Sequence, residues 1–221
     1  DAGDRIACLV AEPIRSNCHV PPHGFWPRLR SLLDRYGVAL IFDEIPSGLG
    51  KTGRFFAFEH FGVVPDMAVL GKSLGGGLLP IAAVIADRRF DVAPELNLGH
   101  YTHEKNPLTT RVALETVRII LRDNLPARAE RLGAHAERVL AATAGGVFAG
   151  LRGLGLLRAV TLDPAALQRR PGLAGAIVEA GLRHGVSTTT KGADAIGFSP
   201  PLVIDEAGIE DAIRRLAAAA E

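Results

Sequence analysis

An aspartate and a lysine follow two short apolar segments of this chain. Asp43 comes directly after the apolar run of residues 38–42, and Lys72 lies two positions beyond the run of residues 67–70. Continuous apolar runs of this length are typical of strands buried on both faces of a parallel sheet. Open α/β sheets bind ligands at the carboxyl ends of such strands. A lysine at a buried strand end must lose its proton, find a counter-charge or form a covalent imine.

Pyridoxal phosphate chemistry requires this pair of residue types. The lysine forms a Schiff base with the cofactor, and the acid keeps the pyridine nitrogen protonated so that the ring can accept electrons. The spacing of Asp43 and Lys72 leaves a second interpretation open, in which the lysine lies on the surface and the aspartate caps a helix.

A nucleotide-binding motif is present only in part. Residues 38–44 are similar to a Walker B strand, and residues 48–52, Gly-Leu-Gly-Lys-Thr, are similar to the end of a P-loop. The P-loop pattern requires glycine where this chain has Ile45, and the two motifs come in the wrong order. The sequence therefore argues against a nucleoside triphosphatase.

The composition indicates a globular protein. Of the 221 residues, 48% are hydrophobic and 22% are charged, and the formal net charge is +1, so no strongly basic field would attract nucleic acid. Two cysteines exclude a disulfide scaffold or a zinc cluster, and Cys8, in an apolar run, is expected to be buried and reduced. No apolar stretch reaches the roughly 18 residues of a membrane span. The chain begins at Asp1 without a signal-peptide pattern, so we expect a cytoplasmic protein and a piece of a longer chain.

The order of the expected elements predicts an α/β fold. Strands are expected at residues 6–10, 38–42, 67–70 and 81–85, with a helix over residues 25–36. The fourth strand is expected to run antiparallel to the third, because the segment between them is too short for a helical crossover. Helices at 108–121, 127–140 and 173–184, a strand at 156–162 and a last helix with Asp205 as N-cap indicate a smaller α+β domain. The predicted domains are residues 1–125 and 126–221.

Several motifs together resemble the class III aminotransferases, which are fold-type I pyridoxal phosphate enzymes. The similarity runs over the whole chain and includes Ala11-Glu-Pro-Ile14, Ile41-Phe-Asp-Glu-Ile45, Gly48-Leu-Gly-Lys-Thr-Gly-Arg54, Pro65-Asp66, Leu70-Gly-Lys-Ser-Leu-Gly-Gly-Gly77, Thr102, Asn106-Pro107, Arg152-Gly-Leu-Gly155 and Ser199-Pro-Pro-Leu202. The resemblance implies the C-terminal half of a mainly parallel-sheet large domain, followed by the small domain.

The resemblance assigns roles to four residues. It makes Lys72 the Schiff-base lysine and proton shuttle, and it pairs Asp43 with the pyridine nitrogen. Ile45 would pack against the ring, and Thr102 would bind the phosphate of the neighbouring subunit's cofactor. That last role implies a homodimer with shared active sites, although Thr102 could instead cap the turn before Asn106 and Pro107.

Three positions depart from the family pattern. Pro46 stands where the family usually has a glutamine that contacts the ring hydroxyl. Gly197 stands where an arginine usually grips the substrate α-carboxylate. Residues 103–105, His-Glu-Lys, are unusually polar for their place.

The absence of an arginine at the position of Gly197 affects which group of the substrate the site can bind. We expect a substrate that is not held by an α-carboxylate, because a bidentate guanidinium clamp is missing. Glu12, which often pairs with that arginine, would then face a substrate amine or hydroxyl. Arg15 is a candidate replacement for binding a phosphonate or phosphate, with a solvated loop charge as the alternative. His100 and His103 have no third partner at metal-ligand spacing, and no metal is predicted.

The expected function is therefore a pyridoxal-phosphate-dependent aminotransferase that transfers an amino group from a small amine, with a keto acid as the candidate acceptor. One alternative is a lyase of the same family that acts on an amino alcohol bearing a phosphonate or phosphate. The other is a catalytically incomplete fragment, because the phosphate-binding loop and the ring-stacking aromatic residue of the family are expected upstream of Glu12. Such a fragment would expose a sheet edge and apolar faces and be poorly soluble.

Overall fold

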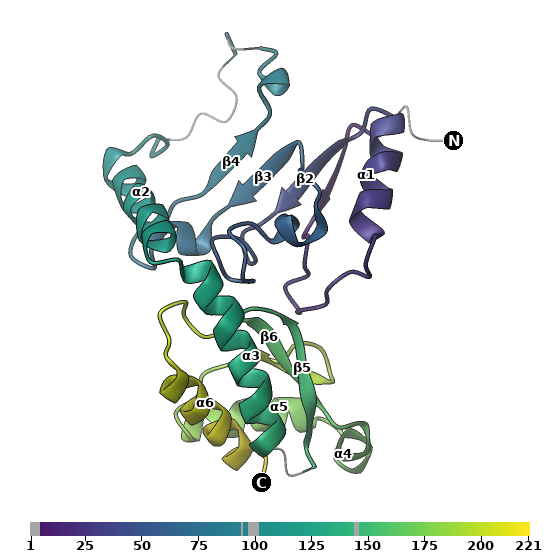
Figure 1. Ribbon diagram of the computed structural model, residues 1–221, viewed down its shortest axis with the longest axis vertical. Coiled ribbons are helices and arrows are strands. Elements are labelled where there is room, and N and C mark those ends of the chain that lie inside the picture. The colour runs from purple at the N-terminus through teal and green to yellow at the C-terminus, as the bar shows by residue number, and fades with distance from the viewer. Residues whose placement is uncertain (1–4, 94, 97–101, 144–145) are drawn as a thin grey trace. The chain divides into compact units, whose positions relative to one another are not determined.

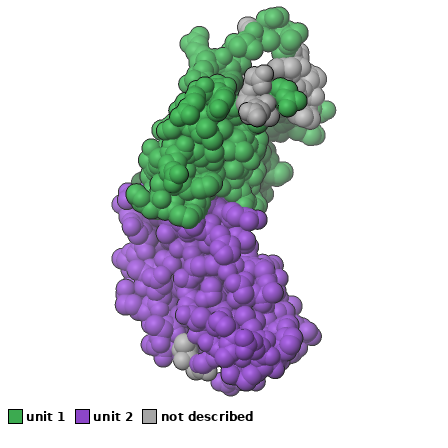
Figure 2. Space-filling view, turned by 90° about the vertical axis from the view of Figure 1, so that its right-hand side faces the viewer, with its two compact units in different colours: residues 1–13, 21–49, 56–123 green, residues 14–20, 50–55, 124–221 purple. Residues whose placement is uncertain are grey.

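The computed structural model describes residues 5–93, 95–96, 102–143 and 146–221. The chain forms two compact units, shown in separate colours in Figure 2. The first unit comprises residues 1–13, 21–49 and 56–123, and the second comprises residues 14–20, 50–55 and 124–221. No helix of the described residues is both long and apolar enough to cross a membrane.

The first unit is built on a four-stranded sheet in the order β1-β2-β3-β4 (Figure 1). Strands β1, β2 and β3 are parallel, and β4 is antiparallel to β3, as the sequence predicts. The strands span Cys8–Ala11, Ala39–Asp43, Met67–Leu70 and Ala83–Ala86. The sheet is thus mixed and mostly parallel, which confirms the predicted α/β class.

Two helices and three short 3-10 helices lie in the described residues of the first unit. The elements are α1 (Phe25–Arg35), η2 (Ala57–Phe61), η3 (Lys72–Gly75), η4 (Arg88–Phe90) and α2 (Pro107–Arg122). Helix α1 packs on β2 through Trp26, whose ring meets Phe42 edge-on at 4.7 Å between centroids. The Trp26 indole also donates a hydrogen bond of 2.9 Å to the carbonyl of Pro13, so its polar atom is satisfied in the core.

The outer strands of this sheet differ from the sequence prediction. Burial on both faces was expected, but Val10 on β1 and Val84 on β4 are each 61% exposed. Cys8 is exposed as well, which makes its predicted burial wrong. Strands β1 and β4 form the two edges of the sheet among the described residues, so each has a neighbouring strand on one side only. An apolar run identifies such a strand but does not show what covers it.

The second unit has α+β architecture. In the described part of this unit, the antiparallel sheet has the order β5-β6-β7 and is accompanied by four helices. The elements are α3 (Leu125–Thr143), β5 (Phe148–Leu154), β6 (Leu157–Leu162), α4 (Pro164–Arg169), α5 (Leu173–Arg183), β7 (Ala195–Phe198) and α6 (Glu206–Ala218). Asp205 caps α6 as predicted, because its carboxylate accepts a 2.8 Å hydrogen bond from the Gly208 amide.

A closed apolar core holds the second unit together. Leu132 of α3, Ile177 of α5, Ile196 of β7 and Ile213 of α6 are all at most 1% exposed. Each helix and strand contributes side chains to one cluster, so this unit buries its apolar residues with its own elements.

Two glycines allow a close approach of backbone segments inside the second unit. A Cβ atom on Gly133 of α3 would lie only 2.2 Å from the carbonyl oxygen of Gly155. Gly155 has φ +53°, and a Cβ there would lie 2.5 Å from the carbonyl carbon of Thr52. Glycine at both positions therefore lets α3, the β5–β6 turn and the 50–55 segment pack against one another.

Candidate functional site

Asp43 is the last residue of β2, and its carboxylate is held by the turn that follows. It pairs in register with Val69 of the parallel strand β3, so the two strand ends lie side by side. Its Oδ1 accepts a 2.9 Å hydrogen bond from the amide of Ile45. The side chain is half-buried. This is the carboxyl edge of the sheet, where α/β folds place ligand groups.

Lys72 begins the short helix η3 directly after β3. Gly71 separates it from the strand, and Lys72 itself has φ 45°, in the left-handed region. The lysine is exposed in the described structure, so the expected burial of its amine is wrong. The position at the strand end is as predicted, but the cover that would bury it is not supplied by the described part of the first unit.

Ile45 lies against the backbone that leads to Lys72. A Cβ atom on Gly71 would be 3.5 Å from both Cγ1 and Cγ2 of Ile45. The strand ends thus bring Asp43, Ile45 and Lys72 to one edge of the sheet, where Ile45 contacts the Asp43 carboxylate through its amide and Gly71 through its side chain. This set provides an acid, an amine and an apolar surface, which are the groups that a pyridinium ring with an aldehyde requires.

The glycines after Lys72 serve packing. Gly76 has φ +64°, and a Cβ there would meet the Thr116 hydroxyl of α2 at 2.8 Å. The absence of side chains lets α2 approach η3 closely, which fixes the segment that carries Lys72.

Of the other predicted residues, Glu12 follows the parallel strand β1 at the same edge of the sheet, whereas Thr102 and Arg15 belong to other segments. Thr102 is exposed in the turn before α2, whose N-terminus is capped by Asn106 with a 2.9 Å bond to the Leu108 amide. Glu12 follows β1 and is half-buried, whereas Arg15 is exposed and belongs to the second unit.

The polar segment before α2 provides no metal site among the described residues. His103 is exposed in the turn, and no group of three potential metal ligands occurs in the described part of the chain. His100 falls outside the described residues.

Glu44 is a buried carboxylate that the sequence analysis did not single out. It is 1% exposed, and it accepts hydrogen bonds from the Ser47 hydroxyl at 2.7 Å and from the Phe58 amide at 2.9 Å. Burial raises the pKa of Glu44 above its usual range, while the hydrogen bonds from Ser47 and from backbone amides oppose the shift. Glu44 therefore fixes the turn that carries Ile45 and Pro46. The sequence feature that could have indicated this buried carboxylate is Ser47, which lies three residues after Glu44 and can donate a hydrogen bond to it.

The lysine of the partial P-loop motif has a structural role in the second unit. Lys51 is largely buried, and its ammonium donates a hydrogen bond to the carbonyl of Pro200. Burial lowers its pKa to about 8. The main-chain carbonyl of Lys51 also accepts a 2.9 Å bond from Leu156. Lys51 thus ties two segments of this unit together instead of projecting from a phosphate-binding loop.

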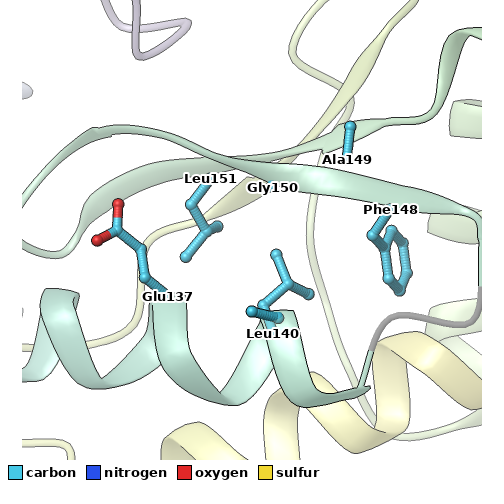
Figure 3. A pocket seen from close by; sticks show the side chains of 7 residues that line it. Glu137, Leu140, Phe148, Ala149, Gly150 and Leu151 are labelled. Atoms are coloured by element: carbon cyan, nitrogen blue, oxygen red, sulfur yellow. The ribbon is translucent and has the colours of Figure 1, made fainter.

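A small cavity of about 270 Å³ lies between α3 and β5 of the second unit (Figure 3). Leu140 and Phe148 form its apolar part, and Glu137 stands at the other end. Glu137 is already paired with Arg158 at 2.7 Å. The cavity contains none of the predicted site residues.

The comparisons with known proteins identify the family. A family model described as "Aminotransferase class-III" matches residues 1–220. The chain belongs to the class III aminotransferases. The enzymes of this family depend on pyridoxal phosphate, and the structural relatives are fold-type I transaminases.

Two curated relatives illustrate the range of named activities. The chain is 35% identical to the (R)-1-hydroxy-2-aminoethylphosphonate ammonia-lyase of Vibrio splendidus, over 94% of this chain and 44% of the relative. It is 39% identical to the acetylornithine aminotransferase of Methanopyrus kandleri, over 97% of this chain and 54% of the relative. The chain thus spans about half the length of these relatives.

Solved structures give the same result. An omega transaminase six-fold mutant from Pseudomonas jessenii matches with a TM-score of 0.88 and 30% identity, over 98% of this chain and 51% of that one. The ornithine aminotransferase of Toxoplasma gondii matches with a TM-score of 0.85 and 34% identity, over 98% and 52%.

Proposed function

We propose that this chain carries part of a pyridoxal phosphate site in which Lys72 attaches the cofactor covalently. The single observation that supports this proposal is the placement of Asp43, Ile45 and Lys72 at the carboxyl ends of the neighbouring strands β2 and β3. Asp43 would hold the protonated pyridine nitrogen, and Ile45 would pack on the ring. Thr102 would bind the phosphate of the neighbouring subunit's cofactor, which makes the whole protein a homodimer with shared sites.

The hydrogen bonding of Asp43 suits its proposed contact with the pyridine nitrogen. The Ile45 amide engages Oδ1, and no described residue donates a hydrogen bond to Oδ2, which leaves that oxygen for the ring. When bound, the cofactor supplies an electron-withdrawing ring that stabilises negative charge on the substrate carbon. Asp43 keeps the proton on the ring nitrogen, and the Lys72 amine removes and returns the proton at the reacting carbon.

The activity we propose is transfer of the amino group from an amine that no arginine holds by an α-carboxylate. Gly197 supports the second part of this proposal, because it offers no side chain to bind an anion. Glu12 and Arg15 remain proposed substrate contacts, with Arg15 suited to a phosphonate or phosphate.

A cofactor titration tests the proposal. The purified chain is titrated with pyridoxal phosphate while its visible absorbance is recorded, with Lys72→Ala as the test variant. Lys105→Ala is the matched control, because Lys105 is 86% exposed and lies in the same unit. We expect a bound-cofactor band in the parent and in Lys105→Ala that is lost in Lys72→Ala. Equal spectra from all three proteins, also after addition of a polypeptide equivalent to the rest of the relatives, would overturn the proposal.

A lyase is the second candidate function. Transamination requires a keto-acid acceptor in the site that the donor has left, and the missing arginine removes a clamp for that acceptor's carboxylate as well. A lyase needs no acceptor, and the Vibrio splendidus relative is named as one. Ammonia released from 1-hydroxy-2-aminoethylphosphonate without any keto acid would favour the lyase. An absolute requirement for a keto acid would favour transamination.

A further inference from the structure

A second cavity of the second unit has the composition of an anion site. It encloses about 430 Å³ between β7, α6 and residues 186–191. Its polar wall carries four hydroxyl side chains and one charged group, the ammonium of Lys191, and none of its lining residues is acidic. The hydroxyl residues are Ser187, Thr188, Thr189 and Ser199. A cation among hydroxyl donors, with no carboxylate beside it, favours an anionic ligand.

Gly197 allows the lysine to occupy this wall. A Cβ atom on Gly197 would lie 3.2 Å from Cε of Lys191 and 3.3 Å from Oγ1 of Thr188. The Lys191 side chain therefore crosses β7 over Gly197, where a Cβ atom would require it to shift by a few tenths of an ångström. The Thr188 hydroxyl donates a 2.6 Å hydrogen bond to the Gly197 carbonyl, so Thr188 and Lys191 both pack against this glycine.

Lys191 is held in place and keeps donor capacity. Its amide donates to the Ala195 carbonyl at 2.8 Å, and its own carbonyl accepts a 2.7 Å bond from Arg152. Its Nζ donates to the Ser16 carbonyl at 2.9 Å. An ammonium has three N–H donors, so two remain for a ligand beyond the bond to Ser16.

Other cations surround this position. Arg152 donates to the Asn17 carbonyl at 3.2 Å and pairs with Asp194 at 2.8 Å. Burial raises the pKa of the Cys18 thiol, and the positive charges of Lys191, Arg152 and Arg158 oppose that rise. Segment 15–18 therefore lies in a region of positive potential, and it begins with Arg15.

We infer that this cavity binds the phosphonate or phosphate end of a short aliphatic amine, with Lys191 as the cation that recognises it. The inference rests on the proposed function for the chemical class of the ligand, a short amine. Lys191 would take the place of the arginine that the family usually has at the position of Gly197. Its side chain lies across β7, and Gly197 leaves the space for it. The Ser199 hydroxyl would supply a further donor to the tetrahedral anion, because the single O–H of Thr188 is already donated to the Gly197 carbonyl.

Binding measurements on the full chain test this inference. The probe is 2-aminoethylphosphonate, titrated calorimetrically into Lys72→Ala protein without cofactor, so that covalent attachment plays no part. We expect Lys191→Gln to weaken binding at least tenfold and Lys191→Arg to retain most of it. Arg169→Gln, which removes one exposed charge from α4 in the same unit, should change binding less than twofold. β-Alanine, with a planar carboxylate, should bind more weakly than the phosphonate.

A second variant guards against misfolding of the first. Gly197→Leu leaves Lys191 in the sequence but displaces its side chain, and it should weaken phosphonate binding to a similar degree. The inference would be overturned if Lys191→Gln and Gly197→Leu, each made in the Lys72→Ala protein, bound the phosphonate as tightly as the Lys72→Ala protein does. It would also be overturned if the Lys72→Ala protein did not bind the phosphonate. Lysine-dependent phosphonate binding in a chain that never attaches pyridoxal phosphate would support the inference while defeating the proposed function.

Discussion

The first unit leaves Val10 and Val84 on its outer strands 61% exposed, whereas Leu132, Ile177 and Ile196 of the second unit are fully buried. Helices α3, α5 and α6 close the core of the second unit from within the chain. Among the described residues, helix α1 packs on β2, and Phe58 and Phe61 of η2 pack against the same core. The proposed cofactor residues thus lie on the less enclosed unit, and the proposed anion site lies in the more enclosed one.

A core truncation gives the largest expected change and tests the closure of the second unit. Leu132→Ala should lower the free energy of unfolding of that unit by about 3–4 kcal/mol, because it removes a fully buried side chain and leaves a cavity. Denaturant unfolding followed by far-UV circular dichroism measures the loss. The only tryptophan, Trp26, is buried in the first unit, so its fluorescence should show little change. Loss of both signals together would mean that the units do not unfold separately.

The buried Lys51 should make the free energy of unfolding of the second unit depend on pH. Its folded pKa of about 8 lies below the unfolded value near 10.4, so the unfolded chain binds more protons between these pH values. Stability from Lys51 should therefore rise with pH across this window, by on the order of 3 kcal/mol at most, and stay constant below pH 8. The difference in unfolding free energy between the parent and Lys51→Met measures it. If the difference in unfolding free energy between the parent and Lys51→Met did not change from pH 7 to pH 10, the lowered pKa of Lys51 would be contradicted.

The buried carboxylate tests the first unit. Glu44→Ala should cost about 2 kcal/mol, because the Ser47 hydroxyl and the Phe58 amide lose their acceptor in a buried site. Trp26 fluorescence during denaturant unfolding reports the effect. Glu59→Ala is the matched control: Glu59 is exposed and accepts a single bond from Phe56, so it should cost at most about 1 kcal/mol. Equal losses would show that burial of Glu44 does not matter.

Replacing a strand valine by threonine in each unit should change stability least in the first unit. Val84→Thr on β4 should alter stability by less than about 0.5 kcal/mol, because the side chain is 61% exposed. Val160→Thr on β6 should cost about 1–3 kcal/mol, because Val160 is 0% exposed and a hydroxyl there would be buried. Thermal or denaturant unfolding of both variants compares them directly. A loss at Val84 as large as at Val160 would mean that β4 is covered in solution.

The sequence predicted the strands of the first unit well because they are short, continuous apolar runs. Strand β3 begins and ends where the run of residues 67–70 does, and β2 is shifted by one residue. The same patterns placed Asp43 and Lys72 at adjacent strand ends. Exposure of Lys72 and Cys8 was not predictable, because it depends on what covers the sheet and not on the strand itself.

Glycine obscured part of the second unit. Strand β5 contains Gly150 and Gly153, both with positive φ, and β7 contains Gly197, so neither reads as a strand by propensity. The sequence marked Gly197 as the loss of a cation, but it could not show that Lys191 crosses the same spot. That contact depends on how residues 186–191 fold back along β7, which only the structure reveals.

The backbone of Lys72 has a consequence for how this chain can change. At φ 45° the residue occupies a conformation that costs a side-chain-bearing residue about 1 kcal/mol or more and costs glycine little. Glycine at this position would therefore relieve strain and remove the amine in one step. If only folding were under selection, mutation would favour that loss. The lysine is therefore kept at this position at a cost in folding stability.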